Sequence, residues 1–220
     1  MHPTTARHRF PIRPVVTTFA PYSPGLSVQE IRDSYHLSRV VKLASNENPL
    51  GTSPLVQRRI AREAAGIFRY PRSGNPALIG KLAESLSLDP KQLVAGNGSD
   101  ELIDLLLRVV GRPRENNVLL LEPSFSIYRM QAELNGLEVR RVPLNKDFSF
   151  PWQALEQSVD DQTACVFLTN PDNPSGYATD SETILSFARR LPHHTLLVLD
   201  EAYIDFAREP DQLSPLTRFR

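Results

Sequence analysis

The stretch Leu196-Leu197-Val198-Leu199-Asp200-Glu201-Ala202-Tyr203 joins an apolar run to a polar turn. Four consecutive apolar residues without polar alternation are typical of a parallel strand that is covered on both faces. Residues 118–121 and 165–168 have the same character, and each of these runs leads into a turn that contains proline. We therefore expect three buried strands of one parallel sheet, each with polar residues beyond its carboxyl end.

Helical patterns separate these runs, because apolar residues recur there at intervals of three and four. Leu78, Leu82 and Leu86, for example, share one helical face. The expected helices span residues 54–65, 75–87, 99–110, 125–135, 152–159 and 182–191, and further strands are expected at 94–98 and 137–144. Strands that alternate with helices of this length indicate an α/β fold with a doubly wound, mostly parallel sheet.

The N-terminal segment is rich in proline. Four prolines interrupt residues 11–24, so we expect an extended arm that holds no helix. Residues 27–35 then form a short predicted helix, with Ser27 as its N-cap and Glu30 at the capping-box position. The expected domains are an arm with this short helix, residues 1–40, and a partial large domain, residues 41–220.

The composition is that of an ordinary globular protein, with 220 residues, 40% of them hydrophobic and 23% charged. The 25 basic and 25 acidic side chains give zero net charge, so we expect no nucleic-acid or membrane-surface partner. No apolar run approaches the roughly 18 residues of a membrane span. The lone cysteine, Cys165, allows no internal disulfide and no thiolate metal cluster, which suits the cytoplasm, and its mid-strand position predicts a core residue.

Any ligand should bind at the carboxyl ends of the strands, as it does in other open α/β sheets. The first polar segment joins the strand expected at residues 94–98 to the helix expected at 99–110, and its sequence is Ala95-Gly96-Asn97-Gly98-Ser99-Asp100-Glu101. Its glycines permit a tight turn, and the free N–H groups of the following helix could cradle a phosphate. The structural alternative is that Ser99 caps the helix while Asp100 and Glu101 complement its dipole. These residues alone favour neither interpretation.

Two more polar segments follow the apolar runs at residues 165–168 and 196–199. Asn170-Pro171-Asp172-Asn173-Pro174-Ser175-Gly176 is either a plain reversal or a turn whose prolines direct the Asn173 amide toward a ligand oxygen. Asp200 is either an ordinary strand-end acid or a partly dehydrated carboxylate that requires a cationic partner. A Walker-B aspartate would need a phosphate loop ending in Gly-Lys-Ser/Thr, but Gly80-Lys81 is followed by Leu82.

Together these motifs resemble those of the fold-type I aminotransferases that depend on pyridoxal 5′-phosphate (PLP), and most closely the histidinol-phosphate aminotransferase family. The segments that carry the resemblance are residues 21–25, 42–51, 69–71, 96–101, 122–125, 170–176 and 200–203. They occur in the family's order and are distributed along nearly the whole chain. No single segment is decisive, but the ordered set is specific.

The resemblance implies roles for four residues that would surround the cofactor ring. Asp200 is expected to pair with the protonated pyridine nitrogen. Asn173 and Tyr203 are expected to hydrogen-bond the phenolic oxygen of the cofactor. Phe125 is expected to stack on the ring face, at a position where many relatives have tyrosine.

The resemblance also implies residues for the phosphate and the substrate. The N–H groups of Ser99 and Asp100 are expected to hold the cofactor phosphate at the start of a helix. Tyr70 would reach that phosphate from the other subunit of a homodimer. Tyr22 and Asn46 would line the substrate side.

The chain departs from the family pattern in two respects. Arg72 stands where the family usually has an acidic residue, and the sequence offers no account of it. None of the four lysines follows Asp200, whereas the family's Schiff-base lysine lies on a later strand, beyond Arg220; the lysines are Lys42, Lys81, Lys91 and Lys146. We therefore expect no catalytic lysine in these 220 residues, and no transamination by them alone.

The implied reaction exchanges an amino group between histidinol phosphate and 2-oxoglutarate in histidine biosynthesis, so the expected partners are a small amino donor and a 2-oxo acid. Threonine-phosphate decarboxylases and aromatic aminotransferases share the cofactor motifs and are the near alternatives. An alternative of a different class is a non-catalytic remnant of such an enzyme.

Overall fold

The computed structural model describes residues 12–19 and 25–219, which form two compact units. The first unit holds residues 12–19 and 77–219 and contains the sheet. The second unit holds residues 25–76, and none of its side chains is buried. The helices of the second unit are α2 (Val28–Tyr35), α3 (Pro54–Glu63) and the short η1 (Ala64–Gly66).

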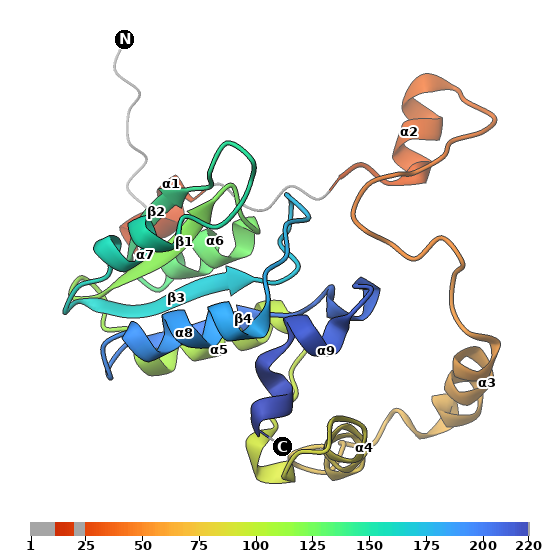
Figure 1. Ribbon diagram of the computed structural model, residues 1–220. Helices are drawn as coiled ribbons and strands as arrows, with labels where there is room; N and C mark the ends of the chain where they lie inside the picture. The colour runs from red at the N-terminus through yellow and green to blue at the C-terminus, as the bar shows by residue number, and fades with distance from the viewer. Residues whose placement is uncertain (1–11, 20–24, 220) are drawn as a thin grey trace. The chain divides into compact units, whose positions relative to one another are not determined.

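Parallel strands form the sheet of the first unit, in the order β2-β1-β3-β4 (Figure 1). They are β1 (Asn117–Glu122), β2 (Glu138–Pro143), β3 (Thr163–Thr169) and β4 (Leu196–Asp200). In the register of β3 and β4, Thr169 lies opposite Asp200. Because the strands are parallel, the loops that follow their carboxyl ends meet at one edge of the sheet.

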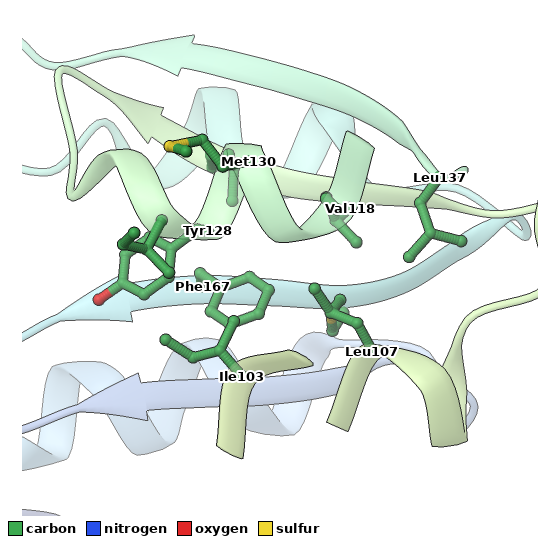
Figure 2. Close-up of a cluster of buried hydrophobic side chains, with 11 residues drawn as sticks. Ile103, Leu107, Val118, Tyr128, Met130, Leu137 and Phe167 are labelled. Carbon is green, nitrogen blue, oxygen red and sulfur yellow. The ribbon is translucent and has the colours of Figure 1, made fainter. Parts of the chain in front are cut away.

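Helices cover both faces of this sheet, which explains the unbroken apolar runs of β1 and β3. Successive strand residues point to opposite faces, so Val118 and Leu119 of β1 enter different hydrophobic clusters. The covering helices are α5 (Gly98–Val110) and α6 (Ser126–Leu134) on one face, and α7 (Trp152–Ser158) and α8 (Ser181–Arg190) on the other. Figure 2 shows the cluster beneath α5 and α6.

The remaining elements of the first unit are one helix of 11 residues and several helices of three to five residues. They are α1 (Pro14–Thr18), α4 (Pro76–Leu86), η2 (Pro90–Gln92), η3 (Ile204–Phe206), α9 (Pro210–Leu213) and η4 (Pro215–Phe219). Within residues 12–19 and 25–219, no helix combines the length and the apolar character that a membrane span requires.

The arm that was expected to hold no helix contains one in its described part. α1 begins at Pro14, where proline is tolerated because the first N–H of a helix has no intrahelical partner. Thr17 Oγ1 donates a hydrogen bond of 2.7 Å to the Pro14 carbonyl. Phe19, which follows the helix, packs against the cluster beneath α6. The expectation of a fully extended arm is therefore wrong at residues 14–18.

Two strand expectations also need correction. Residues 94–98 are not a strand: α5 already begins at Gly98, and no described strand pairs with the segment before it. β4 is a strand, but among the described strands it lies at the sheet edge and pairs with β3 alone, and its Leu196 side chain is 39% exposed. An apolar run indicates the tendency to form a strand, whereas pairing and burial depend on neighbours elsewhere in the chain.

The other expected helices and strands are confirmed within a few residues. The predicted capping box is present: Ser27 Oγ accepts from the Glu30 N–H at 3.1 Å, and the Glu30 carboxylate accepts from the Ser27 N–H at 2.6 Å. Cys165 is the predicted core residue, because it is fully buried in β3. Burial raises the pKa of its thiol to about 12, so it stays protonated and unreactive at neutral pH.

Candidate functional site

A cavity of about 90 Å³ lies beyond the carboxyl ends of β3 and β4. It collects side chains from α5, α6, both strands and the loops that follow them. Its lining residues are Ser99, Phe125, Tyr128, Thr169, Asn173, Asp200, Ala202 and Tyr203. The cavity therefore brings together five residues that the sequence singled out, although they lie as much as 104 positions apart in the chain.

Among the described residues that line this cavity, Asp200 is the only acidic one. Its carboxylate is partly buried and accepts two hydrogen bonds, one per oxygen. Tyr128 OH donates to Oδ2 at 2.7 Å, and the Ala202 N–H donates to Oδ1 at 2.9 Å. Among the described residues, no lysine, arginine or histidine forms an ion pair with it. Each oxygen keeps a second lone pair, so the carboxylate can accept a further proton donor from a ligand.

The buried hydroxyl groups of Tyr128 and Thr169 form a hydrogen-bonded pair next to Asp200. Tyr128 OH lies 2.9 Å from Thr169 Oγ1, and both side chains are buried. Burial, and then the charge of Asp200, raises the pKa of Tyr128 far above its usual value. The phenol therefore stays protonated and remains a hydrogen-bond donor to the carboxylate.

The turn after β3 supplies an amide that faces a phenol from the turn after β4. Asn173 Nδ2 lies 3.5 Å from Tyr203 OH. The buried Asn170 holds the start of this turn, because its amide accepts from the Thr179 N–H and donates to the Thr179 and Leu213 carbonyls. Together, Asn173 and Tyr203 can donate two hydrogen bonds to a ligand oxygen.

The start of α5 borders the same cavity. Gly98 has a φ of +79°, which favours glycine, and the side chain of the N-cap residue Asn97 makes no capping hydrogen bond. Ser99 lies in the first turn rather than at the N-cap, so the interpretation of Ser99 as a cap is wrong. The Glu101 carboxylate accepts from the Asn97 N–H at 2.5 Å, so it is already engaged. The uncapped N–H groups of this turn form a suitable site for an anion.

A second cavity of about 270 Å³ adjoins the first and shares Ser99, Tyr128 and Asp200 with it. Glu201 contributes to this wall; Ser214 donates to its Oε2, whereas its buried Oε1 has no partner in the described chain. Burial raises the pKa of Glu201. Within the same residues, no three His, Cys, Asp or Glu side chains gather as a metal site.

Of the other predicted site residues, only Asp100 lies among the described residues of the first unit, and it is not one of the residues that line either cavity. Asn46 and Tyr70 belong to the second unit, where the Tyr70 side chain is 99% exposed, and Arg72 lies there as well. Tyr22 lies outside the described residues. Asp100 follows Ser99 in the first turn of α5 and is exposed. No lysine is among the described residues that line either cavity.

Sequence reasoning missed Tyr128, Thr169 and Glu201. Tyr128 lies in the expected helix at residues 125–135 but belongs to none of the motifs, and its hydrogen-bond partners lie 41 and 72 positions away in the chain. The one available signal was chemical, because a buried tyrosine hydroxyl needs a polar partner and the nearby strand ends offer few.

Comparison with known proteins shows the family to which the chain belongs. Residues 38–218 match the family model described as aminotransferase class I and II. The chain belongs to the class I and II aminotransferase family. The fold and the resemblance expected from the sequence are thereby confirmed.

Several relatives of this aminotransferase chain are histidinol-phosphate aminotransferases. The protein from Oleidesulfovibrio alaskensis is 53% identical over 199 residues, which are 90% of this chain and 52% of the relative. The protein from Nitratidesulfovibrio vulgaris is 50% identical over 207 residues, which are 94% of this chain and 56% of the relative. The chain thus spans about half the length of the curated relatives it matches.

Solved structures agree with this assignment. Histidinol-phosphate aminotransferase from Sinorhizobium meliloti, determined in complex with pyridoxal 5′-phosphate, superposes with a TM-score of 0.83 at 26% identity, over 98% of this chain and 56% of that one. L-Threonine-O-3-phosphate decarboxylase from Porphyromonas gingivalis superposes with a TM-score of 0.58 at 24% identity, over 70% of this chain and 46% of that one. The second likeness shows the shared fold alone.

Proposed function

We propose that this chain supplies the PLP-binding part of an aminotransferase that acts on histidinol phosphate with 2-oxoglutarate as the amino acceptor. The observation that carries the proposal is the partly buried Asp200 carboxylate, which has oriented hydrogen bonds but no cationic partner in the described chain. A buried anion of this kind fits a ligand that brings its own positive N–H group.

The donors and acceptors around the cavity fit the chemical groups of PLP. When bound, PLP supplies an electron-accepting pyridine ring for amino-group transfer. Asp200 would accept the ring N–H and keep the nitrogen protonated. Asn173 and Tyr203 would donate to the phenolic oxygen, and Phe125 would cover one ring face. The uncapped N–H groups of Ser99 and Asp100 would hold the phosphate.

The relatives favour histidinol phosphate over the alternative substrates. Three relatives that share at least half of the aligned residues with this chain carry that name. The decarboxylase likeness, by contrast, extends only to the fold. The expected cellular setting is histidine biosynthesis in the cytoplasm. No lysine of the described chain borders the cavities, so the expectation that these residues do not transaminate alone stands as part of the proposal.

We also propose that the partner of the second unit is a second copy of the chain. Residues 25–76 bury no side chain and expose large apolar groups, among them Leu43 at 95% and Ile67 at 82%. Apolar surface of this extent is normally covered. In the proposed homodimer, Tyr70 would complete the partner's phosphate site. Sedimentation equilibrium should give twice 24.7 kDa, whereas a monomer at every concentration would contradict the homodimer.

Equilibrium dialysis of pyridoxamine 5′-phosphate against the 220-residue chain tests the cofactor assignment. This form of the cofactor has an amine in place of the aldehyde, so it does not condense with surface lysines. Asp200→Ala should weaken binding by about 10- to 100-fold, because it removes a charged hydrogen-bond partner. Asp161→Ala, on an exposed acid, is the control and should leave the affinity unchanged. Equal affinity of the wild type and Asp200→Ala would overturn the assignment.

The substrate assignment needs a separate measurement. Calorimetric titration of the cofactor-loaded chain should show tighter binding of histidinol phosphate than of threonine phosphate or phenylalanine. A preference for threonine phosphate would support the decarboxylase alternative, and a preference for phenylalanine would support the aromatic aminotransferase.

A further inference from the structure

We infer that Tyr128 is a positioning residue, which orients both the Asp200 carboxylate and the Phe125 ring for the cofactor. The inference rests on the proposed function, because those two side chains are the ones proposed to hold the ring nitrogen and to cover the ring face. It adds a residue that the sequence motifs did not indicate.

The first contact fixes the plane of the carboxylate. Tyr128 has one hydroxyl proton, and the 2.7 Å hydrogen bond to Asp200 Oδ2 uses it, since the carboxylate can only accept. Thr169 must then donate to the phenol oxygen across 2.9 Å. With the Ala202 N–H on Oδ1 at 2.9 Å, both carboxylate oxygens are held, and rotation about the Cβ–Cγ bond would break one bond or the other.

The second contact fixes the aromatic ring. The centroids of Phe125 and Tyr128 lie 5.5 Å apart at an interplanar angle of 84°, a favourable edge-to-face geometry. Tyr128 is in turn stacked on Phe167 of β3, at 4.8 Å and 19°. One buried side chain therefore links the start of α6 to the end of β4, through the core cluster of Figure 2.

The position of Tyr128 in the fold allows both contacts. Its ring belongs to the hydrophobic cluster, while its hydroxyl oxygen lies on the side toward which the strand arrows of Figure 2 point. Its side chain is 1% exposed, yet it lines the cavity at the carboxyl ends. Phenylalanine would keep the packing and lose the hydroxyl, so a single substitution separates the two roles.

The test compares two ligands, pyridoxamine 5′-phosphate and its 1-deaza analogue, in which a C–H group replaces the ring nitrogen. The wild-type chain should prefer the natural compound, because only that compound can donate to Asp200. Tyr128→Phe should weaken binding of the natural compound roughly tenfold, as expected for loss of a hydrogen bond to a charged group. It should leave the affinity for the analogue unchanged, so the preference falls by the same factor. Circular dichroism melting should show that each variant is folded.

Tyr177→Phe is the matched control, because it makes the same change at a tyrosine that packs against the hydrophobic cluster on the other face of the sheet and is not among the residues that line either cavity. It should retain most of the preference for the natural compound. If Tyr128→Phe weakens both ligands equally, or weakens neither, the positioning role is overturned.

Asp200→Asn separates this inference from the proposed function. If Asp200→Asn abolishes the preference while Tyr128→Phe retains it, only the role of Tyr128 fails. If the wild type shows no preference between the two ligands, the proposed function fails, and the inference fails with it.

Discussion

Gly111 shows how closely single residues are packed around the sheet. It ends α5, and its N–H donates to the Leu107 carbonyl at 2.9 Å. A Cβ at this position would lie 2.6 Å from Leu137 Cδ1 and 2.8 Å from that carbonyl oxygen. Gly111→Ala should therefore lower the free energy of unfolding by about 1–3 kcal/mol, measured by urea denaturation.

Gly80 provides the opposite case within the same unit. It lies inside α4, and a Cβ at this position would meet no side chain or neighbouring element within 4 Å, so alanine fits without a clash. Gly80→Ala should raise the free energy of unfolding by up to about 1 kcal/mol, through helix propensity alone. Equal changes in the free energy of unfolding for Gly111→Ala and Gly80→Ala would contradict a steric clash with Leu137 at position 111.

At the scale of elements, the carboxylate of one acidic residue connects three strands. Asp160 accepts from Arg140 of β2 at 2.6 Å and from Asn117 of β1 at 3.0 Å, and also from Thr163 of β3 at 3.1 Å. These hydrogen bonds, led by that of Arg140, lower the pKa of Asp160 well below its usual value. The stabilisation is therefore present above the unfolded pKa of about 4 and is lost as the pH falls toward the folded pKa.

Asp160→Asn should accordingly lower the melting temperature at pH 7, and the difference from the wild type should shrink as the pH falls below about 4. Asp161→Asn, on the exposed neighbour, is the control and should melt like the wild type. A difference between Asp160→Asn and the wild type that stays constant from about pH 7 to about pH 3 would contradict the ionic role of Asp160.

Elements with a local signal could be predicted, and those that depend on distant partners could not. Ser27 and Glu30 form their capping box within one helical turn, so the sequence was sufficient. Residues 94–98 have an apolar start but form no strand, because pairing requires another segment. Pro14 read as a helix breaker, although the same proline is acceptable as the first residue of α1.

The residues of the candidate site also differ in whether they could be predicted from the sequence. Asp200, Asn173 and Phe125 stand in short motifs that a family resemblance can indicate, and the parallel sheet then brings them to one cavity. Tyr128 has no motif, because its role depends on contacts with Thr169 and Asp200, 41 and 72 positions away. Side chains that position other side chains are defined by such long-range geometry.

At the scale of the whole molecule, the two units differ in how they are stabilised. The first unit has hydrophobic clusters on both faces of its sheet, whereas the second buries no side chain in its described residues. The residues proposed to bind the cofactor belong to both units. Asp200 and its neighbours line a cavity of the first unit, whereas Tyr70 lies exposed in the second unit. We therefore expect a complete functional site to need residues from outside the unit that contains the sheet.

A crystal structure of the chain grown with pyridoxal 5′-phosphate would test the proposed cofactor site directly. We expect the ring nitrogen within about 3 Å of the Asp200 carboxylate and the phosphate on the N–H groups of Ser99 and Asp100. An ordered cofactor whose nitrogen faces away from Asp200, or whose phosphate lies away from the start of α5, would contradict the proposed site.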